Sequence, residues 1–66
     1  MTAPIAELSS LASALEELRQ RVSAIADRAA AEDDDDTAGE LFAVERSLIG
    51  AARRLGRITS DAGRRA

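Results

Sequence analysis

Residues 32–40 read Glu32-Asp33-Asp34-Asp35-Asp36-Thr37-Ala38-Gly39-Glu40, and this stretch divides the chain into two segments with helical periodicity. Four consecutive aspartates have low helix propensity, and they repel the negative end of any helix that precedes them. Thr37 and Glu40 match the Thr-x-x-Glu pattern of a capping box, which is typical of a helix start. The stretch therefore predicts an acidic turn between two helices.

The first segment has a heptad pattern. Its apolar residues are separated alternately by three and four positions: Leu8, Leu11, Leu15, Leu18, Val22, Ile25 and Ala29. This spacing places them along one stripe of a helix, as in a coiled coil. Pro4 is tolerated in a first helical turn, where its missing N–H has no partner anyway. We therefore expect a helix at about residues 4–31.

The second segment repeats the rhythm, with Leu41, Val44, Leu48, Ala51, Leu55, Ile58 and Ala62. This spacing predicts a helix at about 38–62, which follows a turn at 32–37 and precedes a short basic tail at 63–66. Because a short turn makes neighbouring helices antiparallel, the expected fold is all-α. Residues 1–66 would form a single domain, an antiparallel helical hairpin of the helix-turn-helix coiled-coil type.

A second apolar line runs along the second helix. Phe42, Ile49 and Gly56 recur every seven residues, and Ala52 lies beside them. These residues either widen the face toward the first helix or contact another chain. A lone hairpin of this size leaves one side of each stripe in water. We therefore expect self-association through Phe42, Ile49, Ala52 and Gly56.

The expected assembly is a homodimer that forms a four-helix bundle, or a complex with another helical protein. The sequence leaves the relative orientation of the chains open. A domain-swapped form, in which the turn straightens into one long helix, is a further alternative.

The two halves of the chain differ in charge. Residues 1–40 carry ten acidic residues and three arginines, whereas residues 41–66 carry six arginines and two acidic residues. In an antiparallel hairpin the acidic helix faces the basic one. We expect Glu16 and Glu17 to lie near arginines of the second helix, namely Arg53, Arg54 and Arg57, and Arg28 to lie near Glu40 and Glu45.

An arginine face is the candidate binding surface, formed by Arg46, Arg53, Arg54 and Arg57. These side chains are either solvated and paired with acidic residues, or they dock a protein partner, or they hold phosphate groups. The sequence pI of 4.8 and the absence of Trp and Tyr argue against nucleic acid.

The composition argues against catalysis. The chain has no His and no Cys, which removes the commonest general base and the thiolate metal ligands. The aspartate run lacks the ligand spacing of an EF-hand loop. We therefore expect no enzyme, metal or cofactor.

No segment approaches the ~20 apolar residues of a membrane span, and no secretory signal is visible, so we expect a cytoplasmic protein. The sequence favours a small protein–protein interaction module with a regulatory or scaffolding role. The alternative is a nucleotide- or nucleic-acid-binding regulator that uses the arginine face.

Overall fold

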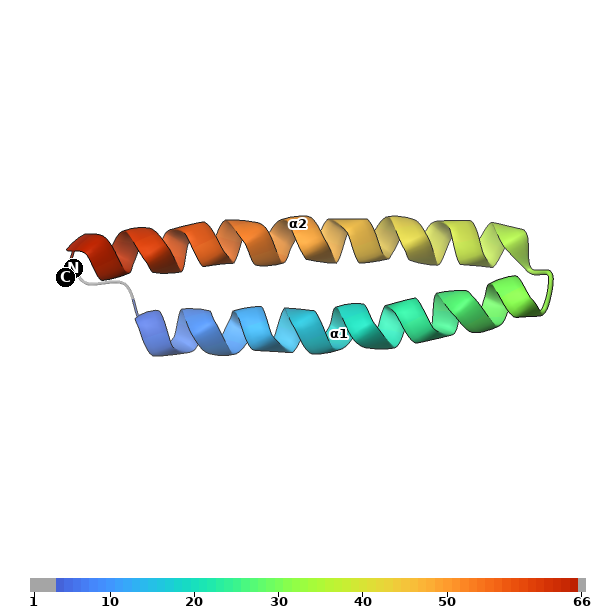
Figure 1. Cartoon of the computed structure of the whole chain (residues 1–66), viewed down its shortest axis with the longest axis horizontal. Helices are drawn as coiled ribbons and strands as arrows, with labels where there is room; N and C mark the ends of the chain where they lie inside the picture. The colour runs from blue at the N-terminus through green and yellow to red at the C-terminus, as the bar shows by residue number, and fades with distance from the viewer. Residues whose placement is uncertain (1–3, 66) are drawn as a thin grey trace.

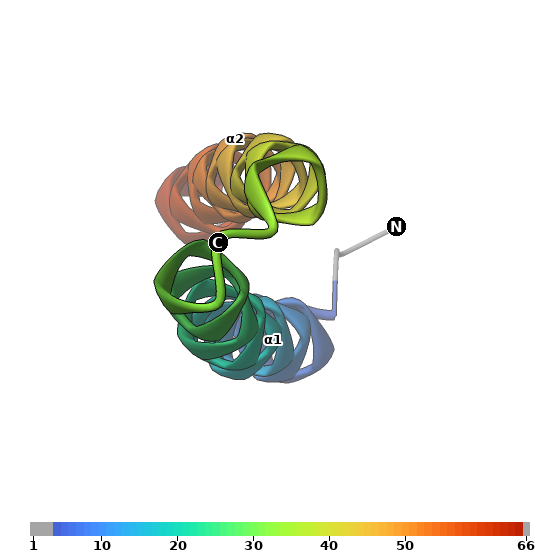
Figure 2. The same cartoon turned by 90° about the vertical axis from the view of Figure 1, so that its right-hand side faces the viewer.

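The chain folds into two helices joined by a tight turn. A computed structural model describes residues 4–65, with α1 at Ile5–Ala31 and α2 at Asp35–Arg65. The helices lie antiparallel and side by side in a rod of 50 × 14 × 13 Å (Figure 1). The predicted all-α hairpin is therefore confirmed. Viewed from the turn, the two helices form a single layer, and residues 4–65 supply no third element over either side of it (Figure 2).

The turn begins with a Schellman motif at the end of α1. The N–H of Asp33 donates to the carbonyl of Ala30 at 3.1 Å, and the N–H of Asp34 donates to the carbonyl of Ala29 at 2.9 Å. Asp33 has φ 61°, the left-handed conformation that this motif requires and that glycine usually supplies. The motif satisfies carbonyl groups at the end of α1 and reverses the chain.

Helix α2 begins at Asp35 rather than at the predicted residue 38. Asp34 acts as its N-cap, because its carboxylate accepts a hydrogen bond from the backbone N–H of Thr37 at 3.3 Å. Thr37 lies inside the helix, so the predicted capping box with Glu40 is replaced by this cap. Asp35 and Asp36 occupy the first turn, where the positive end of the helix dipole favours them.

The hairpin core consists mainly of small side chains. Ala26, Ala29 and Ala38, all close to the turn, are the buried apolar residues of the described chain. Farther from the turn, the partly buried residues that face the other helix recur at intervals of three and four. On α1 they are Ile5, Leu8, Ala12, Leu15, Arg19 and Val22, and on α2 they are Leu41, Glu45, Leu48, Ala52, Leu55, Thr59 and Ala62.

At several levels the antiparallel register, counted outward from the turn, pairs a small residue with a large one. Counting outward from the turn, Ala26 lies opposite Leu41, and Leu15 lies opposite Ala52. An alanine opposite a leucine lets the two backbones approach closely while the leucine fills the space. The described part of the chain has no large side chain that is fully buried, so each helix stays open to solvent on its outer side.

The stripe that faces the partner helix differs from the predicted one. Leu11, Leu18 and Ile25 were expected between the helices, but they are 54%, 45% and 50% exposed. The next residues along the chain, Ala12, Arg19 and Ala26, take the positions that face α2. The physical reason is that the alanines permit close packing and that Arg19 finds a charged partner on α2.

Candidate functional site

The main candidate site is an apolar face on one side of the hairpin. It consists of Leu11, Leu18 and Ile25 of α1 together with Val44 and Ile58 of α2. The two α2 residues are 45% and 48% exposed, close to the values of the α1 residues. Each of these residues directly precedes a position that faces the other helix, such as Ala12, Arg19, Ala26, Glu45 and Thr59. In an antiparallel pair such positions lie on the same side of both helices.

The apolar face is continuous along the rod. The α1 residues recur every seven positions, and on α2 the half-buried Ala51 lies midway between Val44 and Ile58. Because the helices run in opposite directions, the two rows interleave. From the turn outward the order is Ile25, Val44, Leu18, Ala51, Leu11 and Ile58. The result is an apolar strip that solvent reaches over most of the length of the hairpin.

The residues predicted for self-association occupy three different environments. Phe42 and Ile49 are half-buried, and their heptad positions lie on the side opposite the apolar face. Ala52 belongs to the row that faces α1. Gly56 is exposed, and a Cβ atom built there would meet no atom within 4 Å. The larger exposed apolar surface is thus the face that the sequence-based heptad assigned to the hairpin interior.

An ion pair crosses the hairpin near the middle of the rod. A terminal guanidinium nitrogen of Arg19 lies 3.0 Å from a carboxylate oxygen of Glu45, and the two side chains are 27% and 17% exposed. Sequence reasoning missed this pair. The available signal was one charged residue in each helix, directly after the apolar residues Leu18 and Val44.

Arg19 also binds Glu16 on its own helix. Two guanidinium nitrogens of Arg19 donate to the Glu16 carboxylate at 2.7 and 2.9 Å. This hydrogen bonding lowers the pKa of Glu16 and raises the pKa of Arg19. Among residues 4–64 the ion pairs of Glu16 involve Arg19, and the expected pairs with Arg53, Arg54 and Arg57 are absent.

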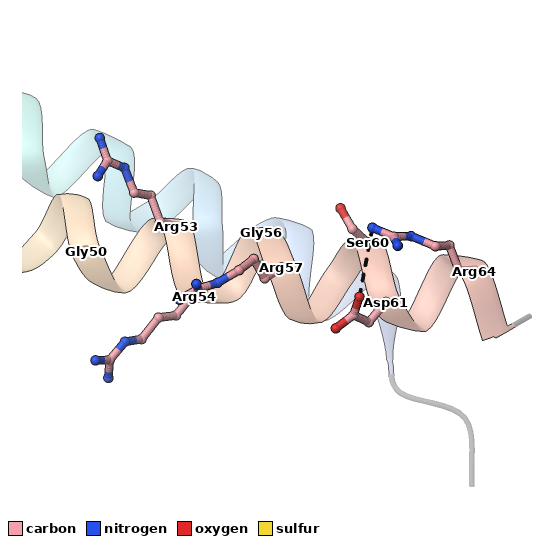
Figure 3. A pocket seen from close by; sticks show the side chains of 8 residues that line it. All are labelled: Gly50, Arg53, Arg54, Gly56, Arg57, Ser60, Asp61 and Arg64. Atoms are coloured by element: carbon pink, nitrogen blue, oxygen red, sulfur yellow. Dashed lines mark ion pairs between the residues drawn. The ribbon is translucent and has the colours of Figure 1, made fainter.

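The second candidate site is an open groove on the outer side of α2. It is lined by Gly50, Arg53, Arg54, Gly56, Arg57, Ser60, Asp61 and Arg64. Arg46 is exposed but does not line the groove, whereas Arg64 was not predicted and does. Arg53 and Arg54 point in different directions (Figure 3), and Arg64 lies 4.0 Å from Asp61. The cationic groups therefore do not converge on a single point.

Other kinds of site have no support in the described chain. Within residues 4–65, no helix is long and apolar enough to cross a membrane. The same residues contain no cluster of acidic side chains that could hold a metal ion. Comparison with known proteins finds no match to a family model, a curated protein or a solved structure.

Proposed function

We propose that this chain is a non-enzymatic protein–protein interaction module that self-associates through its apolar face. The observation that carries the proposal is the row of five large apolar side chains, each 45–54% exposed on one side of a two-helix layer. Two such faces packed together form a four-helix bundle, in which each hairpin supplies the cover that the other lacks. A regulatory or scaffolding role suits a module of this kind.

The energetics support association. Full burial of a large apolar side chain contributes roughly 1.5–3 kcal/mol, so covering the exposed half of each contributes roughly 1 kcal/mol. A face of 50 by 14 Å has an outline of roughly 700 Å², close to the ~800 Å² that each partner contributes to a standard interface. Because the hairpin itself buries few large groups, this additional burial is a substantial share of the stability of the chain.

Sedimentation equilibrium across a range of concentrations tests the proposal. We expect the wild-type chain to have the mass of a dimer, and Leu18→Asp to have the mass of a monomer at the same concentrations. Ser10→Asp is the matched control, since it adds the same charge to an exposed position of α1 away from the apolar face. A wild-type chain that stays a folded monomer at every concentration would refute the proposal.

A second candidate function is anion binding by the groove of α2, toward phosphate groups of a nucleotide or nucleic acid. Its support is the gathering of Arg53, Arg54, Arg57 and Arg64 around one open surface. Phosphate-driven binding weakens steeply as salt is added, so a salt titration with a labelled oligonucleotide tests it. We expect Arg53→Glu with Arg57→Glu to abolish such binding, and no binding at low salt would exclude this function.

A further inference from the structure

The two ends of the hairpin carry opposite charge. Around the turn, residues 25–42 contain seven acidic residues and the single cation Arg28. At the open end, residues 4–15 and 52–64 contain four arginines and only two acidic residues, Glu7 and Asp61. The rod is 50 Å long, several times the ~8 Å Debye length at physiological salt. Each end therefore presents its own charge to a partner.

Two hairpins that stack through their apolar faces have two arrangements with twofold symmetry. If both turns lie at the same end, α1 packs on α2 of the second copy, and the two acidic turns lie together. If the turns lie at opposite ends, α1 packs on α1 of the second copy, and each acidic turn lies against an arginine-rich open end. Only the second arrangement joins unlike charges at both ends of the bundle.

The apolar residues of α1 are complementary to themselves in that arrangement. With a twofold axis beside Leu18, this residue meets Leu18 of the second copy. Leu11 then lies opposite Ile25 of the second copy, and the reverse contact follows from symmetry. The three α1 residues thus form one row of contacts with large side chains throughout.

Charged residues that flank the apolar face also come near residues of opposite charge in the second copy. Glu7 lies four residues before Leu11, and Arg28 lies three residues after Ile25, so both flank the α1 row. The same axis brings Glu7 opposite Arg28 of the second copy. On α2, Glu40 precedes Val44 and Arg54 precedes Ile58 by four residues. The same axis lies level with residue 49 of α2, so it brings Glu40 to about one helical turn from Arg54 of the second copy. With both turns at one end, Glu7 would instead lie opposite Asp61.

We infer that the partner on the apolar face is a second copy of this chain in the antiparallel orientation, with its turn against the arginine-rich end. This inference rests on the proposed function, because it specifies the orientation of the same self-association. It assigns Glu7 and Arg28 to ion pairs between chains. The outer arginines Arg57 and Arg64 lie toward the acidic turn of the partner.

Electron spin-label distances test the orientation. The chain has no native cysteine, so one introduced cysteine gives one label per copy. For Ala31→Cys, beside the turn, labels in the antiparallel dimer are separated by about 39 Å along the rod, at 1.5 Å per residue. Glu17→Cys, close to the axis, is the control, because its two labels have almost no separation along the rod in either arrangement.

The possible outcomes distinguish the claim that the chain self-associates from the claim about the orientation of the two copies. In a dimer, a distance for Ala31→Cys no longer than that for Glu17→Cys would overturn the orientation and leave self-association standing. No dipolar coupling for either label, together with a monomer mass, would overturn both. Circular dichroism of each labelled variant establishes that the hairpin is folded before distances are compared.

Charge reversal at Glu7 gives an independent test, because the two arrangements predict opposite changes in dimer affinity. In the antiparallel dimer, Glu7→Arg places two like charges at each of two symmetric contacts, so we expect dimer affinity to fall roughly 3- to 10-fold. Adding Arg28→Glu in the same chain should restore it. If the turns lay at the same end, Glu7→Arg would strengthen the dimer through Asp61. Arg21→Glu, which flanks the same row and meets Ala14 of the second copy, is the control.

Discussion

Arg19 of α1 and Glu45 of α2 form an ion pair at 3.0 Å across the middle of the hairpin. Both occupy positions that would hold apolar residues in a regular two-helix interface. A polar pair at such positions specifies which residues lie opposite each other, because any shift along the helix separates the charges. The pair therefore selects the register of the two helices.

A double-mutant cycle on this pair should reveal that coupling. Arg19→Met and Glu45→Gln should each lower the melting temperature by about 2–5 °C, on the scale of a small domain. The melting temperature of the double variant should fall by less than the sum of the two single changes, because each single change also leaves the other charged side chain without its partner. Thermal unfolding followed by circular dichroism measures all four proteins. Strictly additive losses would show that the pair does not couple the helices.

The turn contains a position where a substitution should stabilise the chain. Asp33 adopts φ 61°, which is unfavourable for a side-chain-bearing residue and neutral for glycine. We expect Asp33→Gly to raise the free energy of unfolding by about 0.5–1 kcal/mol in urea titrations. Asp33→Ala, which removes the charge but keeps the Cβ atom, separates the conformational effect from the electrostatic one. A gain for alanine equal to that for glycine would contradict the conformational explanation.

Two substitutions of Asp34 test whether this residue is the N-cap of α2. Asp34→Ala removes the acceptor for the Thr37 N–H, and it should cost about 0.5–2 kcal/mol of stability. Asp34→Asn retains an acceptor and should lose much less. If Thr37 and Glu40 formed the cap instead, Thr37→Ala would carry the loss. Urea unfolding of the three variants distinguishes these assignments.

Gly50 offers a test of the outer surface of α2. Beyond its own stretch of helix backbone, a Cβ atom at this position would meet no atom of the hairpin within 4 Å. Gly50→Ala should therefore stabilise the helix by about 0.5–1 kcal/mol through propensity alone, with a higher melting temperature. A loss of stability would mean that another chain approaches this glycine closely. Repeating the melt at several protein concentrations identifies that case.

The stability of the hairpin should fall in acid partly through Glu16. The hydrogen bonds from Arg19 lower the pKa of Glu16 below its ordinary value of 4.5 in the folded chain. A carboxylate with a lowered pKa contributes stability above its unfolded pKa, and the contribution disappears as pH falls through the folded pKa. We therefore expect Glu16→Gln to destabilise the chain at pH 7 and to reduce its further loss between pH 4.5 and acid. Melting temperatures at pH 7 and pH 3 measure the difference.

Glu17→Gln is the control for this pH dependence. Glu17 is exposed next to Glu16 and takes part in none of the ion pairs described within residues 4–64. The same substitution there should leave the difference between pH 7 and pH 3 close to that of the wild-type chain. Equal effects at both positions would show that general charge, rather than the contact with Arg19, governs the acid response.

The sequence alone determined the two helices, the position of the turn and the antiparallel hairpin. These features depend on local signals: the 3-4 spacing of apolar residues from Leu8 to Ala62, and the aspartate run between the two segments. The same aspartate run led to a wrong prediction for the start of α2, which begins at Asp35 rather than at residue 38. Aspartate is unfavourable inside a helix, but Asp34 is favourable as a cap, and Asp35 and Asp36 are favourable in a first turn.

Only the tertiary structure decided which apolar stripe faces inward. The row of Leu11, Leu18 and Ile25 and the adjacent row of Ala12, Arg19 and Ala26 have the same seven-residue period, so periodicity cannot choose between them. The choice depends on how closely two backbones approach at alanine and on whether Arg19 reaches Glu45. Both depend on residues of the other helix, which become neighbours only when the chain reverses at Asp33, and the larger side chains are thereby left on the surface.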